Sequence, residues 1–148
     1  MRRLKPAVVL VAALAACSGE PSGVSSPDSQ LAGHSFGLAS IDGHPLPAIY
    51  YNSPDSTFRA AASSGSLVFT DSTVRWDRRV LVYYPIAPTE PSVQDLSESW
   101  RHRLVGQTLQ FLTGDAVVFT GLLAGDVILM SFRHRDIPIG TWRFELER

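Results

Sequence analysis

Residues 73–84 read TVRWDRRVLVYY, and this stretch decides the fold. One side of an extended chain through it carries Val74, Trp76, Val80, Val82 and Tyr84. Apolar residues at every second position are typical of a β-strand with one buried face. Arg78 falls on the same side, and burying an unpaired charge is costly. The stretch therefore predicts either a bulge near Arg78 and Arg79 that turns Arg78 outward, or an arginine that points into the interior towards a partner or ligand.

Strand-like patterns also occur on both sides of this stretch. The last of them is the clearest, because residues 141–147 alternate apolar and charged side chains without a break. The other segments with such patterns are 35–41, 46–51, 65–70, 100–105, 109–111, 117–123 and 127–132. Tight turns separate many of them, and Asp42-Gly43 is a strong hairpin signal because glycine tolerates a positive φ. The pattern predicts an all-β domain of eight or nine short strands.

Four segments fit this scheme less directly. Residues 52–64 are polar and small, which predicts a loop, and residues 93–99 are compatible with one helical turn. Residues 117–123 and 127–132 are apolar on each face, so we expect both strands to be largely covered.

Meandering hairpins favour an antiparallel up-and-down β-barrel, because closing the sheet removes its exposed edges. A Greek-key sandwich is the alternative arrangement of so many short strands. Residues 31–33 leading into a strand, the segment IDGHPLP at 41–47, the turn region 121–126 and the closing strand 142–148 resemble small lipocalin-like bacterial lipoproteins. This resemblance covers most of residues 31–148 and implies a single lipocalin-like barrel domain.

The N-terminal part of the chain has the layout of a secretory signal. A basic start is followed by an apolar run at 7–14, which is shorter than the roughly 20 residues needed to span a membrane. The segment Leu14-Ala15-Ala16-Cys17 then resembles the lipobox of bacterial lipoproteins. The resemblance implies that residues 1–16 are removed and that Cys17 is acylated, for example with palmitate. Two or more acyl chains anchor a protein stably in a membrane.

Residues 17–30 predict a flexible tether, because they contain too few apolar side chains to form a core. Ser18 follows the acylated cysteine, and in lipoproteins of bacteria with two membranes an aspartate at this position favours retention in the inner membrane. We therefore expect an envelope protein on the outer side of the cytoplasmic membrane, with the outer membrane favoured where one exists.

Composition excludes several classes of function. Three of the 13 basic residues and none of the 14 acidic ones lie in the signal segment, so the mature chain has a net charge of about −4. Such a chain lacks the basic surface of a nucleic-acid-binding protein. The single cysteine leaves no disulfide, and the four histidines have no metal-ligand spacing. We expect no metal and no cofactor, and no motif indicates a catalytic residue.

The candidate ligand contacts are Trp76, Arg78, Trp100 and His102, whose positions place them on the predicted inner face of two strands. An eight-stranded barrel is either filled by side chains or has room for one small ligand. A small apolar or anionic amphipathic ligand inside the barrel is the leading hypothesis. The alternatives are a filled barrel that acts as an envelope interaction or structural module, and a hydrolase of unknown type.

Overall fold

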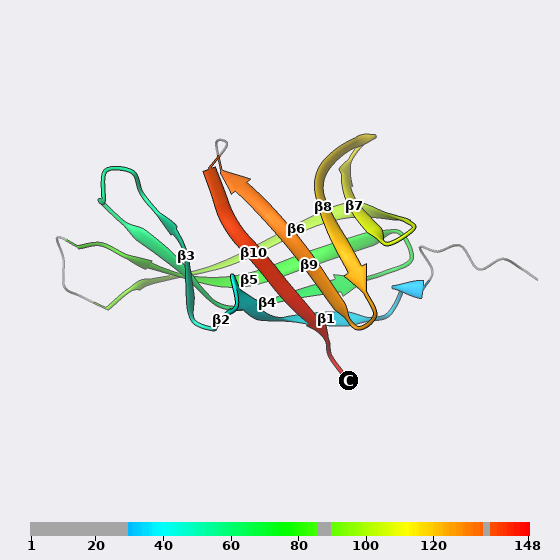
Figure 1. Ribbon diagram of the computed structural model, residues 1–148, viewed down its shortest axis with the longest axis horizontal. Coiled ribbons are helices and arrows are strands. Elements are labelled where there is room, and N and C mark those ends of the chain that lie inside the picture. Colours follow the sequence, from blue (N-terminus) through cyan, green and yellow to red (C-terminus); the bar gives the residue numbers. More distant parts are fainter. Residues whose placement is uncertain (1–29, 86–89, 135–136) are drawn as a thin grey trace, which may run out of the picture.

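The computed structural model describes residues 30–85, 90–134 and 137–148, and Figure 1 shows the strands in this part of the chain. The predicted signal segment, Cys17 and all of the predicted tether except Gln30 lie outside the described residues. The strands are β1 (Ser35–Ile41), β2 (His44–Pro45), β3 (Ala48–Asn52), β4 (Arg59–Phe69), β5 (Thr73–Tyr83), β6 (Ser92–Val105), β7 (Thr108–Thr113), β8 (Ala116–Ala124), β9 (Val127–His134) and β10 (Ile137–Leu146).

Eight of these strands form a closed antiparallel barrel. Each strand from β4 to β10 pairs with the next along the chain, and β1 closes the circle between β10 and β4. Phe36 marks the closure, because it pairs with Leu146 on one side and with Leu67 on the other. Strands β2 and β3 are additions that pair with β1 and with the first part of β4. The predicted up-and-down barrel is confirmed. The described part of the chain has ten strands where eight or nine were predicted, and the strand that was not predicted is the two-residue β2.

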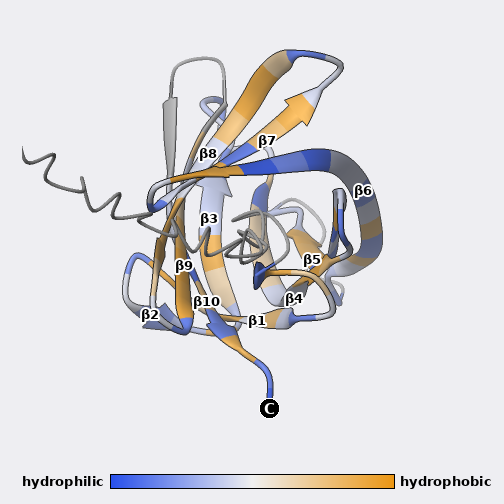
Figure 2. Cartoon of the chain, turned by 90° about the vertical axis from the view of Figure 1, so that its right-hand side faces the viewer, coloured by the Kyte–Doolittle hydropathy of each residue, from blue (hydrophilic) through white to orange (hydrophobic). Residues whose placement is uncertain are grey.

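Aromatic side chains fill much of the described barrel interior. The Trp76 ring stacks on Phe132 with centroids 4.9 Å apart, and Trp142 meets Trp76 edge-on at 5.3 Å. Phe119 meets the rings of both Trp100 and Phe132 edge-on at 5.3 Å. Aromatic pairs of this kind contribute about 0.5–1.5 kcal/mol each beyond the area they bury. Figure 2 shows the hydropathy of the residues along the strands, with hydrophobic and hydrophilic bands visible on several of them.

Two of the expected elements differ from the structure. Residues 93–99 belong to β6 and pair with β5 from Ser92 to Arg101, so the helical turn is wrong. All of residues 92–99 are exposed, so this part of the strand lacks the apolar alternation that reveals a half-buried strand. The predicted loop at 52–64 is also too long, because β4 begins at Arg59. Its buried alanines at 60–62 are weak strand formers, although they fit closely against β3.

The expected coverage of 117–123 is also wrong. Val117, Val118 and Leu122 are between 42% and 44% exposed. The reason is that β8 pairs with β9 only from Gly121 to Ala124, although it pairs with β7 along most of its length. The first half of β8 therefore lacks a registered β9 neighbour, and Val117 and Val118 there are exposed, whereas Phe119 still packs against the core. Leu122 is exposed although it pairs with Leu129 of β9.

The end of the barrel that carries the β4–β5 turn, here named the sealed end, is closed by the segment before β1. The Gly33 amide donates to the Phe69 carbonyl at 3.0 Å, and the Phe69 amide donates to the His34 carbonyl at 3.0 Å. These bonds hold Leu31 over the interior, where it is 4% exposed and belongs to the main core. The opposite end, which carries β3 and the β3–β4 hairpin, is named the mouth end (Figure 1). Within the described residues, no helix has the length and apolar character needed to cross a membrane.

Candidate functional site

Arg78 points towards the barrel interior. Strand β5 pairs with β6 without a break from Thr73 to Val82, so it contains no bulge that would turn Arg78 outward. The irregularity lies on the neighbouring strand, where Ser63 is an extra residue of β4. Arg78 therefore keeps the same face as Trp76 and Val80, and its side chain is only 15% exposed. The outward alternative for Arg78 is wrong.

Two partners compensate the charge of Arg78. Its guanidinium carbon lies 4.1 Å from the centroid of the Trp76 ring, which is a cation–π contact. Its Nη1 donates to Oε2 of Glu98 on β6 at 2.9 Å. The Glu98 side chain is 48% exposed, so one member of the ion pair remains in water. This arrangement reduces the desolvation cost that would make a fully buried charge unfavourable.

Arg78 lies between two apolar clusters. Along the inner face of β5, Val74 and Trp76 belong to the main core, whereas Val80 and Val82 belong to a smaller cluster with Ala60. The smaller cluster lines a cavity of about 260 Å³, which we name the mouth pocket. Its walls are Tyr50, Tyr51, Phe58, Ala60, Val80, Val82, Gln94 and Leu96. Leu96 is directly opposite Arg78 in the β5–β6 pairing, so the pocket adjoins the arginine.

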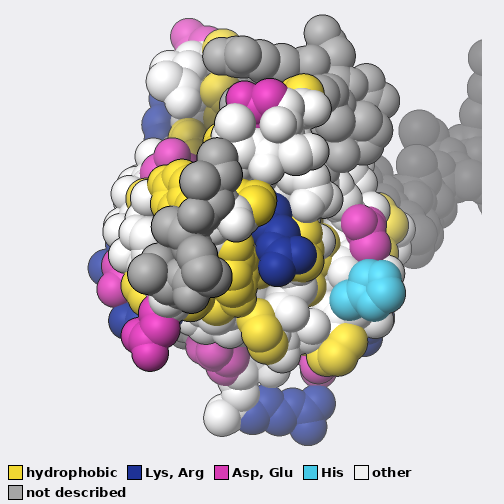
Figure 3. Space-filling view, turned by 90° about the vertical axis from the view of Figure 1, so that its left-hand side faces the viewer, with side chains coloured by type: hydrophobic (Ala, Val, Ile, Leu, Met, Phe, Trp, Pro, Cys, Tyr) yellow, Lys and Arg dark blue, Asp and Glu magenta, His cyan; other side chains and the backbone are white. Residues whose placement is uncertain are grey.

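The surface of the mouth end agrees with this arrangement. Figure 3 views the molecule from this end and shows a basic side chain surrounded by hydrophobic ones. An apolar pocket with a few polar groups beside it is the usual form of a small-molecule site. The volume lies slightly below the roughly 300–1,000 Å³ of pockets for drug-sized ligands. The mouth pocket therefore suits a small ligand or one end of a longer one.

Tyr50 connects the mouth pocket with the main core. Its ring meets Trp142 edge-on at 5.1 Å, and it packs against both apolar clusters. Burial raises the pKa of Tyr50 above its ordinary value, and the positive charge of Arg78 opposes part of that rise. The phenol is therefore neutral at physiological pH and retains a hydroxyl group that can donate a hydrogen bond near the arginine.

The four predicted contact residues are not all in one place. Trp100 lies beside Trp76 with ring centroids 6.1 Å apart, so Trp76 contacts both Trp100 and Arg78. His102 lies in the sealed end, where its ring meets Phe69 edge-on at 5.2 Å. Its Nε2 donates to the Thr70 carbonyl at 3.0 Å, because a carbonyl oxygen can only accept. Ligand contact by any of the four residues stays a prediction.

Two buried nitrogens have no hydrogen-bond partner among the described residues: Nε1 of Trp76 and Nδ1 of His102. An unsatisfied buried donor or acceptor costs about 1–3 kcal/mol. The Trp76 donor is notable because the same ring contacts the Arg78 guanidinium.

Sequence reasoning missed most of the pocket walls. Tyr50 lies just before the segment expected to be a loop, and Phe58 lies within it. Leu96, together with Glu98, the partner of Arg78, lies in the segment expected to be a helical turn. The only signal for Glu98 was its parity with Trp100 and His102, which would have placed it on the inner face had residues 93–99 been interpreted as a strand.

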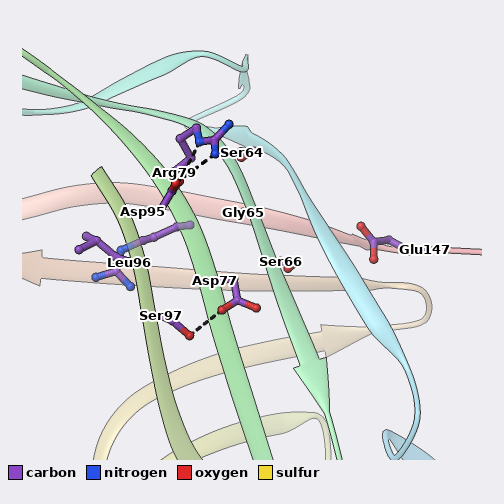
Figure 4. Close-up of a pocket in the computed structure, with 10 residues that line it drawn as sticks. Ser64, Gly65, Ser66, Asp77, Arg79, Asp95, Leu96, Ser97 and Glu147 are labelled. Carbon is purple, nitrogen blue, oxygen red and sulfur yellow. Dashed lines mark hydrogen bonds and ion pairs between the residues drawn. The ribbon is translucent and has the colours of Figure 1, made fainter. Parts of the chain in front are cut away.

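A second hollow, here named the outer groove, lies along β4, β5 and β6 and has a volume of about 550 Å³ (Figure 4). Arg78 and Leu96 are among its lining residues, so the outer groove meets the mouth pocket at Leu96. Arg79 binds Asp95 through two nitrogens, at 2.7 and 3.1 Å, and the Ser97 hydroxyl donates to Asp77 at 2.6 Å. The Ser97 bond is the main cause that lowers the pKa of Asp77, with a contribution from Arg75. These groups are largely exposed and neutralise one another, so the outer groove has little unsatisfied charge for a ligand.

The described residues contain no group of three or more histidine, cysteine, aspartate or glutamate side chains arranged to hold a metal ion. Cys17 and its predicted acylation lie outside the described residues. Comparison with known proteins gives no match to a family model, to a curated protein or to a solved structure.

Proposed function

We propose that this protein is a lipid-anchored, non-catalytic β-barrel of the cell envelope that binds a small apolar or amphipathic ligand at the mouth end of the barrel. One observation carries the proposal: an apolar pocket of about 260 Å³ adjoins a half-exposed ion pair on the inner face of the sheet. A ligand with an apolar part and a polar end matches that combination of surfaces.

The mouth pocket is a better candidate than the centre of the barrel. Trp76 and Trp142 are only 4% and 2% exposed and contact each other and Phe132, so the described interior at this level is packed. In contrast, Leu96 and Tyr51 in the pocket wall are partly exposed. A ligand can therefore reach the pocket without displacing the aromatic core.

The lipid anchor is supported by sequence alone. A basic start, a short apolar run and the lipobox-like segment ending at Cys17 together resemble a lipoprotein signal. Cys17→Ala should abolish incorporation of radioactive palmitate and release the protein from the membrane fraction. Label that persists in the variant would contradict the anchor, and it would leave the binding proposal untouched.

Ligand binding can be tested with a pocket-filling variant and a matched control. Leu96→Trp adds bulk to the pocket wall at a side chain that is 37% exposed, so the fold should tolerate it. Val93→Trp makes a similar change on the same strand at an exposed position outside the pocket lining. Calorimetric titration with ten-carbon amphiphiles should show saturable binding to the wild type and to Val93→Trp, and weak or no binding to Leu96→Trp.

The second candidate function is a scaffold or interaction module with a filled barrel. The packed aromatic interior favours it, because these described rings contact one another and stabilise the barrel at their level. If none of the amphiphiles binds the wild type, the ligand proposal is wrong and the scaffold becomes the better account.

A further inference from the structure

We propose that Glu98 occupies the position of an anionic ligand head group, and that the natural ligand is an amphiphile whose carboxylate or phosphate replaces Glu98 on Arg78. This inference rests on the proposed function and specifies its ligand class. It also assigns Glu98 a role in selectivity, because the ligand must compete with this side chain for the guanidinium.

The geometry of the ion pair supports the exchange. Arg78 is held from one side by the Trp76 ring at 4.1 Å, so the guanidinium has a fixed support. Its link to Glu98 is a single contact, from Nη1 to Oε2 at 2.9 Å. A guanidinium can bind a carboxylate or phosphate through two parallel hydrogen bonds. A ligand head group can therefore form a better contact with Arg78 than Glu98 does.

The difference in exposure makes Glu98 the mobile partner in the exchange. The Arg78 side chain is 15% exposed and that of Glu98 is 48% exposed. After displacement, the glutamate can remain charged in water at small cost, whereas an arginine without a partner would be left in a largely desolvated site. The ligand anion thus restores the partner that Arg78 loses.

The position of the pocket defines the rest of the ligand. Leu96 and Val80 lie next to Arg78 on the inner face, and both line the mouth pocket. A head group on Arg78 places an attached alkyl or aromatic tail among Val82, Phe58 and the pocket tyrosines. Tyr50 lines the same pocket and lies close enough to Arg78 for the arginine charge to lower its pKa, so its hydroxyl is near the same head group. The site thereby matches an anion with one short apolar tail rather than a neutral or cationic amphiphile.

The test compares three ligands that share a ten-carbon tail: decanoate, 1-decanol and decyltrimethylammonium. Binding is measured by calorimetry at about 0.15 M salt, where exposed charges farther than about 8 Å are largely screened. The wild type should bind decanoate more tightly than decanol and should bind the cation most weakly. Equal affinities for decanoate and decanol would overturn the exchange, yet they would leave ligand binding in the mouth pocket established.

Glu98→Gln should strengthen decanoate binding by roughly two- to fivefold, because it removes a competitor whose partly exposed pair is weak. Decanol affinity should not change. Asp95→Asn is the matched control, since it removes the same charge from the same strand at a residue whose ion-pair partner is Arg79 rather than Arg78. If Asp95→Asn strengthens decanoate binding as much as Glu98→Gln does, general charge explains the effect and the exchange is wrong.

Arg78→Leu should remove the preference for decanoate and retain decanol binding. Arg78→Lys keeps the charge without the planar fork, so it should restore part of the preference. A preference for decanoate that survives both substitutions would overturn the assignment of Arg78 as the head-group contact. If no ligand binds the wild type at all, the proposed function itself has failed.

Discussion

The two ends of the barrel handle buried polar groups in different ways. At the sealed end, His102 is 6% exposed and uses its Nε2 to bind a backbone carbonyl of the β4–β5 turn. At the mouth end, Arg78 is more exposed and pairs with a side chain, Glu98, that stays half in water. The histidine bond joins two parts of the fold, whereas the arginine bond joins two side chains that can separate.

This difference indicates which polar group is the better candidate for ligand binding. Replacing the backbone carbonyl at the sealed end would require the β4–β5 turn to move away from β6. Replacing Glu98 requires only a change of side-chain conformation, which costs far less than moving packed backbone. A polar group near the interior is therefore a better binding candidate when its partner is an exposed side chain than when it is the chain itself.

The largest effect is expected at the core shared by the two ends. Trp142 is 2% exposed and contacts Trp76 and Phe132. Trp142→Ala should lower the free energy of unfolding by about 3–5 kcal/mol, because it leaves a large cavity. Denaturant unfolding gives this value, and Ile49→Ala, at a residue 50% exposed, is the control. A loss below about 1 kcal/mol would show that the ring is not part of the packed interior.

The next effect concerns the sealed end. His102→Ala removes the bond to Thr70 and the edge contact with Phe69, and it should lower the free energy of unfolding by about 1–3 kcal/mol. Calorimetric affinity for decanoate should be unchanged, because the histidine lies in the end opposite the mouth pocket. His44→Ala, at an exposed residue of β2, should alter neither quantity. A large loss of affinity in His102→Ala would show that the two ends are coupled.

At the mouth end, we expect a substitution to change ligand binding and to leave the free energy of unfolding nearly unchanged. Arg78→Leu loses a cation–π contact and a partly exposed ion pair, but it also removes a charge from a largely desolvated position. These contributions oppose each other, so the free energy of unfolding should stay within about 1 kcal/mol of the wild type. Thermal and denaturant unfolding measure it. A loss of 3 kcal/mol or more would make Arg78 a structural residue of the core.

The contrast between the packed core and the mouth end also explains which parts of the structure could be predicted from the sequence. The closing strand and β5 were identified because Trp142, Phe144, Val74 and Trp76 are buried at alternating positions and contact one continuous core. The mouth pocket was missed because its walls depend on Ala60 and on Leu96. The first is a weak strand former, and the second lies in a strand exposed on both faces. Strand pairing over long separations, which local periodicity does not encode, positions both residues.

The direction of the Arg78 side chain also could not be predicted from local periodicity. A charged residue in an apolar register suggested a bulge in β5, but the extra residue, Ser63, belongs to β4. Sequence alone identified an unusual position correctly. The inward direction of Arg78 depends on its partner Glu98, which lies 20 residues further along the chain. The β5–β6 pairing brings Glu98 opposite Trp76.

The smallest effect is expected on the outer face of the strand that carries Arg78. Asp77 accepts hydrogen bonds from Ser97 at 2.6 Å and from Arg75 at 2.8 Å, and together these lower its pKa below the ordinary value of 3.8. A carboxyl group with a lowered pKa in the folded state stabilises the fold fully above its unfolded pKa. That contribution disappears as the pH falls from about 3.8 through the lower folded value.

Ser97→Ala removes the main cause of this shift, so the pKa of Asp77 should rise towards 3.8 in an NMR titration. The free energy of unfolding should then fall less steeply below pH 4 than in the wild type, and at neutral pH the loss should be slight because the pair is exposed. Ser99→Ala, two residues along β6 and opposite Arg75, should leave the titration unchanged. Decanoate affinity should be the same in all three proteins, since Asp77 lies outside the mouth pocket. If Ser97→Ala leaves the pKa of Asp77 where it was, the Ser97 hydroxyl does not hold this carboxylate, and the outer groove is less ordered than the inner face beside it.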